Sequence, residues 1–288
     1  MKKLLIASFA LLLMQPFASS AQMGKVFDHL TMPSKILNST RNYAVYLPPD
    51  YETSDRTYPV LYLLHGSLDD QTGWVQFGEV SHIADKAIAE GTATPMVIVI
   101  LDGNGGRRGF VNDIKGDWNF EDFFFQEMIP FIEKKYRVKT DKKFRAVSGL
   151  SMGGGSTFIY ALHHPEMFSS ACPLSGDIGP VTLEDARKAY TRGNPNLPDS
   201  VIVNYYKSHS VISLIDNMPE AQKKAVRWYI AAGDQDGLSE GDALVHIEMR
   251  KKDIPHEFRI DDGGHNWVFW RASLAKVLDF VSEAFHQP

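Results

Sequence analysis

The sequence predicts an α/β fold in which a mainly parallel central sheet carries helices on both faces. Short, almost continuous apolar runs alternate along the chain with longer segments in which apolar residues recur at helical spacing. Such apolar runs are typical of strands buried on both faces, and strands separated by helices favour parallel pairing. No Pro/Gly/Ser-rich linker, repeat or low-complexity tract interrupts this alternation over the 288 residues, a length that suits one large domain.

Each element is predicted from its own pattern. Asn42 to Leu47 alternate polar and apolar residues like a half-exposed strand, which the pair Pro48-Pro49 ends. The other predicted strands are Val60 to Leu64, Met96 to Leu101, Phe144 to Ser148, Ala225 to Ala231 and His256 to Ile260. The predicted helices are Val80 to Ile88, Phe120 to Tyr136, Thr157 to Leu162, Ala243 to Lys251 and Val268 to Phe285. Residues 176–222 fit this scheme least well, and we expect an insertion over the carboxyl edge of the sheet, where open α/β sheets bind ligands.

The first 21 residues predict a signal peptide. A basic start at Lys2 and Lys3 precedes the apolar run Leu4 to Leu13, which is too short to span a bilayer comfortably. Small residues at Ser19-Ser20-Ala21 favour cleavage before Gln22. We expect a single mature domain of residues 22–288, periplasmic or secreted and without a membrane anchor; the alternatives are an uncleaved anchor or a buried first helix.

Composition disfavours several other classes of protein. The formal net charge is −5 and no basic stripe is present, so we expect no nucleic-acid partner. The single cysteine, Cys172, lies in an apolar stretch, which favours a buried small side chain over a reactive thiol. Because the sequence has no H-E-x-x-H motif and no paired Cys/His spacing, we expect neither a metal nor an organic cofactor. The sequence does not indicate an oligomeric state.

A glycine-rich turn follows the predicted strand Phe144 to Ser148. The run Gly149-Leu150-Ser151-Met152-Gly153 matches G-x-S-x-G, the motif that places a serine on a sharp turn between a strand and a helix. Glycines leave room around such a serine, and N–H groups at the start of the helix can stabilise an oxyanion. We therefore expect Ser151 as nucleophile and the Met152 N–H as an oxyanion donor. The alternative is a tight turn whose serine only caps the helix.

The partners of the serine are expected downstream, in the chain order serine, acid, histidine. His265 follows two glycines in a loop after the last predicted strand, and it is the predicted catalytic base. Asp234 and Asp236 both lie in the loop after the preceding strand. One of them would orient the imidazole and the other would serve as a turn or capping residue, and the pattern alone leaves this choice open.

A second oxyanion donor is predicted in the loop after the strand Val60 to Leu64. Gly66 lets the backbone approach the substrate, so the N–H of Ser67 is the expected donor. His65 stands beside this loop, where a structural role is favoured over that of a base.

Together these motifs resemble the esterase D-like branch of the α/β-hydrolases, over roughly residues 40–286. The branch contains the family 1 carbohydrate esterases (feruloyl and acetylxylan esterases), the S-formylglutathione hydrolases and the siderophore esterases. The resemblance implies an α/β-hydrolase fold, favours Asp236 as the acid and matches Ser67 to an oxyanion donor. It rests on Tyr46-Leu47-Pro48-Pro49, Leu63-Leu64-His65-Gly66 with Trp74 beyond, Gly149 to Gly154, His164 to Phe168, Gly233-Asp234-Gln235-Asp236 and Gly263-Gly264-His265.

The run from Gly264 to Arg271 looks most like the feruloyl esterases of polysaccharide-degrading bacteria. The resemblance implies a serine esterase that hydrolyses plant cell-wall carbohydrate esters, above all feruloyl esters, through an acyl-enzyme. Its expected substrate is an ester-bearing oligosaccharide or another small ester, and the leader implies that the enzyme is secreted. Trp74 and Trp267 flank predicted catalytic loops and are expected to bind substrate, whereas Trp118 and Trp270 fit core packing equally well. The alternatives are acetylxylan or siderophore ester hydrolysis, and a non-catalytic binding protein on a hydrolase fold.

Overall fold

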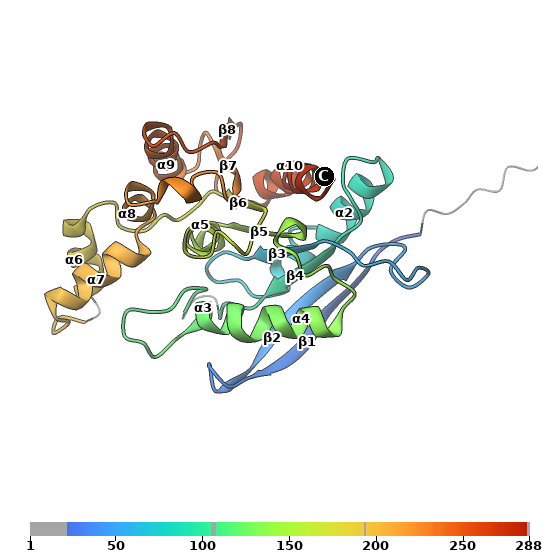
Figure 1. Ribbon diagram of the computed structural model, residues 1–288, viewed down its shortest axis with the longest axis horizontal. Helices are drawn as coiled ribbons and strands as arrows, with labels where there is room; N and C mark the ends of the chain where they lie inside the picture. Colours follow the sequence, from blue (N-terminus) through green and yellow to red (C-terminus); the bar gives the residue numbers. More distant parts are fainter. Residues whose placement is uncertain (1–21, 105–107, 193, 287–288) are drawn as a thin grey trace, which may run out of the picture.

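A computed structural model describes residues 22–104, 108–192 and 194–286 (Figure 1). Within these residues the strands form one eight-stranded sheet in the order β1-β2-β4-β3-β5-β6-β7-β8. Strands β1 and β2 and strands β2 and β4 pair antiparallel, and every other neighbouring pair is parallel. The strands are β1 (Lys25–Ser34), β2 (Ser39–Leu47), β3 (Val60–Leu64), β4 (Val97–Leu101), β5 (Arg145–Leu150), β6 (Ser170–Leu174), β7 (Arg227–Gly233) and β8 (Glu257–Asp261).

Helices cover both faces of this sheet, which confirms the predicted fold class. Helices α2 and α10 pack on one face, and α4, α5, α8 and α9 pack on the other. Figure 1 shows α2 and α10 beside each other on one side of the strands. The helices are α1 (Gly73–Gln76), α2 (Val80–Ala89), α3 (Phe120–Phe123), α4 (Ile129–Lys135), α5 (Met152–His163), α6 (Leu183–Thr191), α7 (Asp199–His209), α8 (Val211–Asp216), α9 (Ser239–Lys251) and α10 (Trp267–His286), with a π-helical turn at Phe124–Met128 and 3₁₀ turns at Lys142–Phe144 and Glu220–Gln222.

The central strands explain why two cores form. In β3 every residue is buried, and successive side chains point to opposite faces of the sheet. Tyr62 therefore belongs to the core under α4 and α5, and Leu61 and Leu63 belong to the core under α2 and α10. The same alternation in β4 and β7 extends both cores across the sheet. Cys172 is buried in β6, as its apolar surroundings predict.

The predicted elements agree with the structure except at a few places. Strand β3 has the predicted bounds, and the other predicted strands and helices are displaced by a few residues at one or both ends. The predicted helix from Phe120 to Tyr136 is interrupted by the π-helical turn. Strands β1 and β6 were not predicted. Strand β1 is an edge strand in which only two of the ten residues are buried, so it lacks a continuous apolar run. Strand β6 contains Pro173, and a proline in the sequence argues against a central strand.

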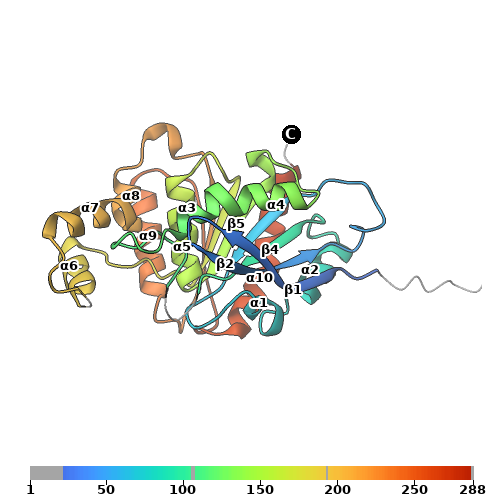
Figure 2. The ribbon, with the colours of Figure 1, turned by 90° about the horizontal axis from the view of Figure 1, so that it is seen from below.

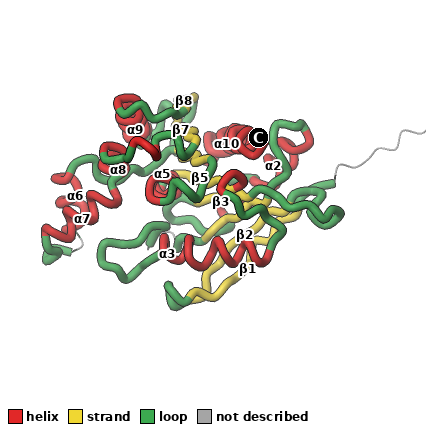
Figure 3. The backbone as a smooth tube through the Cα atoms, viewed as in Figure 1, coloured by secondary structure: helices red, strands yellow, loops and turns green. Residues whose placement is uncertain are grey.

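Residues 176–222 form α6, α7 and α8 between β6 and β7. Figures 1 and 2 show α6 and α7 at one end of the molecule, outside the layers of sheet and helices. The loop from β4 to α3 reaches the same end (Figure 3). Tyr205 of α7 donates a hydrogen bond of 2.8 Å to the carbonyl of Asn112 in that loop, so the two segments are joined.

The predicted signal peptide, residues 1–21, lies outside the described residues. Among the residues that the structure does describe, no helix is both long and apolar enough to cross a bilayer.

Candidate active site

Ser151 stands on the turn between β5 and α5. Its backbone has φ 55° and ψ −118°, a strained conformation for a residue with a side chain. The turn is tight: a Cβ added at Gly149 would lie 2.5 Å from the carbonyl oxygen of Gly153, and one added at Gly153 would lie 2.6 Å from that of His65. Glycine is therefore required on both sides of Ser151, as the motif predicts.

Hydrogen bonds hold this strained turn in place. The N–H of Ser151 donates to the carbonyl of Leu174 at 2.9 Å, which ties the turn to the end of β6. The carbonyl of Ser151 accepts from the N–H groups of Gly155 at 2.9 Å and Asp177 at 3.0 Å. The serine thus occupies a fixed position at the carboxyl edge of the sheet.

The structure brings Ser151, His265 and Asp236 into one hydrogen-bonded chain. The distance from Nε2 of His265 to Oγ of Ser151 is 2.9 Å, and Nδ1 of His265 lies 2.9 Å from Oδ2 of Asp236. Because an ionised carboxylate only accepts hydrogen bonds, Nδ1 carries the proton in this pair. Nε2 is then free to accept the hydroxyl proton of Ser151, which is the geometry of a general base beside a nucleophile.

The two aspartates after β7 have different surroundings. The Asp236 side chain is fully shielded from solvent, and its Oδ1 also accepts a hydrogen bond of 2.8 Å from the N–H of Leu238. Asp234 instead accepts a hydrogen bond of 3.1 Å from the N–H of Gly263, and so links the loops that follow β7 and β8. Only Asp236 contacts the imidazole of His265, whereas Asp234 fixes the loop that carries it.

A second buried carboxyl group lies behind the first. Asp242 of α9 is fully buried and accepts a hydrogen bond of 3.0 Å from the N–H of Gly176. Burial raises the pKa of Asp242 well above its usual value, and the charge of Asp236 raises it further. Burial and the neighbouring carboxyl group therefore both disfavour a charge on Asp242 in the interior behind His265.

Trp270, which fits the core and the site equally well in sequence, positions the imidazole. The ring of Trp270 meets that of His265 edge to face, with centroids 4.9 Å apart. Its indole N–H donates to Oγ of Ser175 at 3.1 Å, so the ring is fixed. The sequence pattern does not separate this contact from core packing, because an apolar position of α10 suits either role for Trp270.

The loop after β3 lies against the nucleophile. A Cβ added at Gly66 would lie 3.4 Å from Cβ of Ser151 and 2.6 Å from Cδ1 of Leu150, so the backbone approaches closely only because glycine is present. Ser67 follows at the exposed surface. Met152 opens α5, where the first N–H groups of a helix lack partners within the helix. The segments that carry both expected oxyanion donors therefore flank Ser151.

His65 braces this loop. Its Nδ1 donates to the carbonyl of Gly66 at 2.7 Å, and its Nε2 accepts from the N–H of Gly103 at 3.0 Å. Burial lowers the pKa of His65, which favours the neutral ring that this pair of hydrogen bonds requires. The side chain thus joins the loops after β3 and β4, in the structural role expected for it.

The expectation that Trp74 binds substrate is wrong in this structure. Trp74 belongs to α1 and is fully buried, and its indole N–H donates to the carbonyl of Leu64 at 3.0 Å. Position beside a catalytic loop does not reveal which way a side chain points, and here the ring points into the core. Trp267 is only partly buried and meets the ring of Trp74 edge to face, with centroids 5.2 Å apart. Trp118 and Trp270 are buried.

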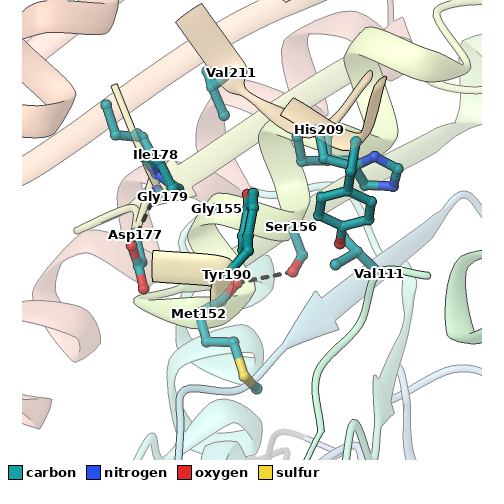
Figure 4. A pocket seen from close by; sticks show the side chains of 13 residues that line it. Val111, Met152, Gly155, Ser156, Asp177, Ile178, Gly179, Tyr190, His209 and Val211 are labelled. Atoms are coloured by element: carbon teal, nitrogen blue, oxygen red, sulfur yellow. Dashed lines mark hydrogen bonds between the residues drawn. The ribbon is translucent and has the colours of Figure 1, made fainter. Parts of the chain in front are cut away.

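A pocket of about 230 Å³ opens beside the nucleophile turn (Figure 4). One wall is the face of α5 that begins at Met152, and residues from the segment 176–222 form most of the rest. Figure 4 shows Asp177 and Ile178 on one side and Val111 and His209 on the other. Aromatic rings dominate one part of the lining: Tyr205 stacks on His209 at 4.0 Å, and Tyr190 meets Tyr205 edge to face at 5.3 Å. Sequence reasoning placed the segment over the site but did not identify these residues.

A network of histidines anchors this aromatic wall. Glu121 of α3 accepts hydrogen bonds from His163 at 2.7 Å and contacts His164 at 3.3 Å. Nε2 of His163 donates to the carbonyl of Ser208 in α7 at 2.5 Å. Burial opposes ionisation of Glu121, but these two histidines bring its pKa down to about 2. His163 at the end of α5 is therefore joined to α3 through Glu121 and to α7 through the carbonyl of Ser208.

The Esterase family model matches residues 34–281. A solved ferulic acid esterase is 33% identical, with a TM-score of 0.80 over 91% of this chain and 99% of that one. An endo-1,4-beta-xylanase/feruloyl esterase of Xylanibacter ruminicola is 38% identical over 155 residues, which are 52% of this chain and 21% of that protein. An esterase of Mycobacterium tuberculosis is 38% identical over 136 residues, 46% of this chain and 28% of that protein. The match thus spans less than a third of the length of either curated relative.

Proposed function

The chain belongs to the Esterase family, and we propose that it hydrolyses hydroxycinnamoyl esters, such as feruloyl esters, of plant cell-wall carbohydrate. It is a serine carboxylic-ester hydrolase with an α/β-hydrolase fold. The observation that carries the proposal is the hydrogen-bonded chain from Ser151 through His265 to Asp236, next to a pocket with an aromatic wall.

In the first half of the reaction, Oγ of Ser151 attacks the ester carbonyl while Nε2 of His265 takes its proton. The N–H groups of Met152 and Ser67 stabilise the oxyanion that forms. Asp236 stabilises the imidazolium through the hydrogen bond to Nδ1. The tetrahedral intermediate then collapses, the bond to the sugar oxygen breaks, and His265 returns the proton to the leaving alcohol.

In the second half, water replaces the sugar. His265 takes a proton from the water as its oxygen attacks the acyl-enzyme, and the same two N–H groups stabilise the second oxyanion. Collapse of this intermediate breaks the bond to Oγ of Ser151, which regains its proton from His265. The products are the free acid and an enzyme ready for another turnover, with no cofactor used in either half.

The pocket supports an aromatic acyl group. A volume of about 230 Å³ is far larger than an acetyl group requires, and its lining combines apolar side chains with the rings of Tyr190, Tyr205 and His209. Aromatic rings gain from edge-to-face and offset contacts with a ligand ring. The ferulic acid esterase and the xylanase/feruloyl esterase named above act, by their names, on esters of this kind.

Steady-state kinetics test the proposal. The full chain without its leader is assayed on methyl ferulate, a feruloylated arabinoxylan oligosaccharide and an acetylated xylo-oligosaccharide. We expect kcat/KM to be at least tenfold higher for the feruloylated than for the acetylated oligosaccharide, since the acetyl group leaves the aromatic wall without a contact. A preference for the acetylated substrate would reject feruloyl specificity, and turnover of a siderophore ester alone would point to that alternative. No turnover and no reaction with a fluorophosphonate would indicate a non-catalytic binding protein.

We also propose that residues 1–21 direct export and are then removed, which leaves a single domain in the periplasm or outside the cell. The support is the order of basic, apolar and small residues before Gln22. Expression of the full chain in a bacterial host should yield an exported protein whose first residue is Gln22, by mass spectrometry. An intact leader on cytoplasmic protein would contradict export.

A further inference from the structure

We propose that an aromatic shelf formed by Phe77 and Trp267 binds the carbohydrate leaving group of the ester. This inference rests on the proposed function and adds a second subsite to it. Trp267 lies just after His265 in the chain, whereas the pocket of Figure 4 begins at Met152 and extends along α5. The two subsites would thus divide the substrate at its ester bond.

The shelf exposes apolar side chains in a fixed arrangement. Phe77 is 51% exposed, and Val268, which is next to Trp267 in the chain, is 70% exposed. The ring of Phe77 lies 6.0 Å from that of Trp267, with an angle of 37° between the planes. Exposed apolar side chains that gather beside a catalytic group favour a binding surface over a chance exposure.

The shelf is supported from below. The fully buried Trp74 holds the ring of Trp267 edge to face at 5.2 Å. Arg271 of α10 donates a hydrogen bond of 2.8 Å to the carbonyl of Phe77, and its Nε lies 3.6 Å from Glu79. Such bracing fixes the rings before a ligand arrives, so that less conformational entropy is lost on binding.

The same rings continue to the catalytic base. Trp267 meets Trp270 edge to face at 5.3 Å, and Trp270 meets His265 in the same way at 4.9 Å. The shelf is therefore built on the same short segment of α10 that positions the imidazole. A sugar bound on Phe77 and Trp267 would therefore lie beside the series of rings that ends at His265.

The chemistry of the reaction requires the leaving group on that side. Nε2 of His265 returns a proton to the departing sugar oxygen, so this oxygen must come within hydrogen-bond distance of the imidazole. The acyl group remains bonded to Oγ of Ser151, and the pocket beside Met152 can hold it. Sugar rings present faces of C–H groups that pack on aromatic side chains. A carbohydrate alcohol fits the shelf better than a small alcohol such as methanol, which cannot reach it.

Substrates with and without the sugar test the shelf. In Phe77→Ala, in Trp267→Phe and in the wild type, kcat/KM is measured for methyl ferulate and for a feruloylated arabinoxylan oligosaccharide. Trp267→Phe retains an aromatic ring against Trp74 and replaces the indole with a smaller ring. The control is Ile247→Ala, because Ile247 is 45% exposed on α9, away from the shelf.

We expect the ratio of kcat/KM, oligosaccharide over methyl ferulate, to fall about fivefold or more in Phe77→Ala and in the same direction in Trp267→Phe. Ile247→Ala should keep the wild-type ratio. An unchanged ratio in both shelf variants overturns the inference. A loss that is equal for the two substrates gives the same unchanged ratio, and would show that the shelf holds the acyl group instead.

The two proposals fail in distinguishable ways. A wild type that hydrolyses no hydroxycinnamoyl ester contradicts the proposed acyl specificity, whatever the shelf does. In that case kcat/KM is measured for an acetylated xylo-oligosaccharide and for ethyl acetate. The ratio of the first value to the second should then fall in the two shelf variants by the same factor. A wild type that hydrolyses both feruloyl esters, with shelf variants that keep its ratio, rejects the shelf alone.

Discussion

Asp236 and His265 lie 29 residues apart in the chain and meet through a hydrogen bond of 2.9 Å between Oδ2 and Nδ1. The carboxylate is fully shielded from solvent, and the imidazole side chain is 36% exposed. The acid thus acts from the interior on a base that remains accessible to substrate. This asymmetry supports a fixed orientation of His265, with its Nε2 directed at Ser151.

The two aspartates after β7 should differ strongly in their effect on turnover. Asp236→Asn should lower kcat by about 10³- to 10⁴-fold, since an amide does not hold the imidazole in the required tautomer. Asp234→Asn should cost less than about tenfold, because an amide oxygen can still accept the hydrogen bond from Gly263. Initial rates at saturating methyl ferulate provide the comparison, and the opposite order would show that Asp234 is the functional acid.

His65 should affect catalysis without contacting substrate. His65→Leu removes the hydrogen bonds to Gly66 and Gly103, so the oxyanion loop is no longer held beside Ser151. We expect kcat to fall about 100-fold, close to the loss of one oxyanion donor, with KM changed less than about threefold. His65→Gln, which can still donate and accept hydrogen bonds, should recover part of kcat. Circular dichroism of both variants checks the fold, and an unchanged kcat in folded His65→Leu would exclude the bracing role.

Tyr190 should contribute to kcat/KM only for substrates whose acyl group is aromatic. Tyr190→Ala removes one ring from the wall of the pocket, so kcat/KM for methyl ferulate should fall about five- to tenfold. The value for ethyl acetate should change less than about twofold, since an acetyl group does not reach the wall. Phe27, which is 42% exposed on the edge strand β1 and does not line the pocket, offers the control Phe27→Ala. An equal loss on both substrates would indicate a general structural effect instead.

The Glu121–His163 ion pair should stabilise the protein within a limited pH range. Hydrogen bonds lower the pKa of Glu121 from 4.5 to about 2 and raise that of His163 above 6.5, although burial opposes both charges. The lowered pKa contributes stability above pH 4.5, which is lost as the pH falls towards 2. The raised pKa contributes stability below pH 6.5, which is lost as the pH rises through the folded value. The pair therefore contributes most between about pH 4.5 and 6.5.

Urea unfolding at pH 3, 5.5 and 9 measures this range. Glu121→Gln should lower the free energy of unfolding by about 3 kcal/mol at pH 5.5, with a smaller loss at pH 3 and at pH 9. The control Glu166→Gln changes an exposed carboxylate near the same helix end and should have little effect. A loss in Glu121→Gln that is equal at all three values would contradict an ionic origin.

The sequence predicts those parts of the site that a local motif encodes. Ser151 and Gly153 belong to one sharp turn, whose geometry permits few residue types, and His265 stands in a glycine loop after a strand. The choice between Asp234 and Asp236 depends on which carboxylate points inward. Both aspartates occupy the same loop, so only the tertiary fold separates them.

The wrong expectation for Trp74 and the unidentified pocket residues have a common physical cause. Trp74 and Trp267 both flank catalytic loops in sequence, but one ring points into the core and the other towards the surface. The wall of the pocket, with Tyr190, Tyr205 and His209, comes from helices whose orientation depends on contacts with the β4–α3 loop and α5. The sequence pattern identifies helices and strands, whereas the direction of a side chain at a surface depends on how they pack.

Replacing Ser151 with Ala tests most directly whether this serine is the nucleophile. We expect a fluorophosphonate to add one covalent group to the wild-type chain, on the peptide that contains Ser151, and none to Ser151→Ala. We also expect kcat for methyl ferulate to fall by about 10⁴-fold or more in the variant, whose thermal unfolding should remain cooperative. Covalent labelling or near-normal turnover in folded Ser151→Ala would contradict the assignment of Ser151.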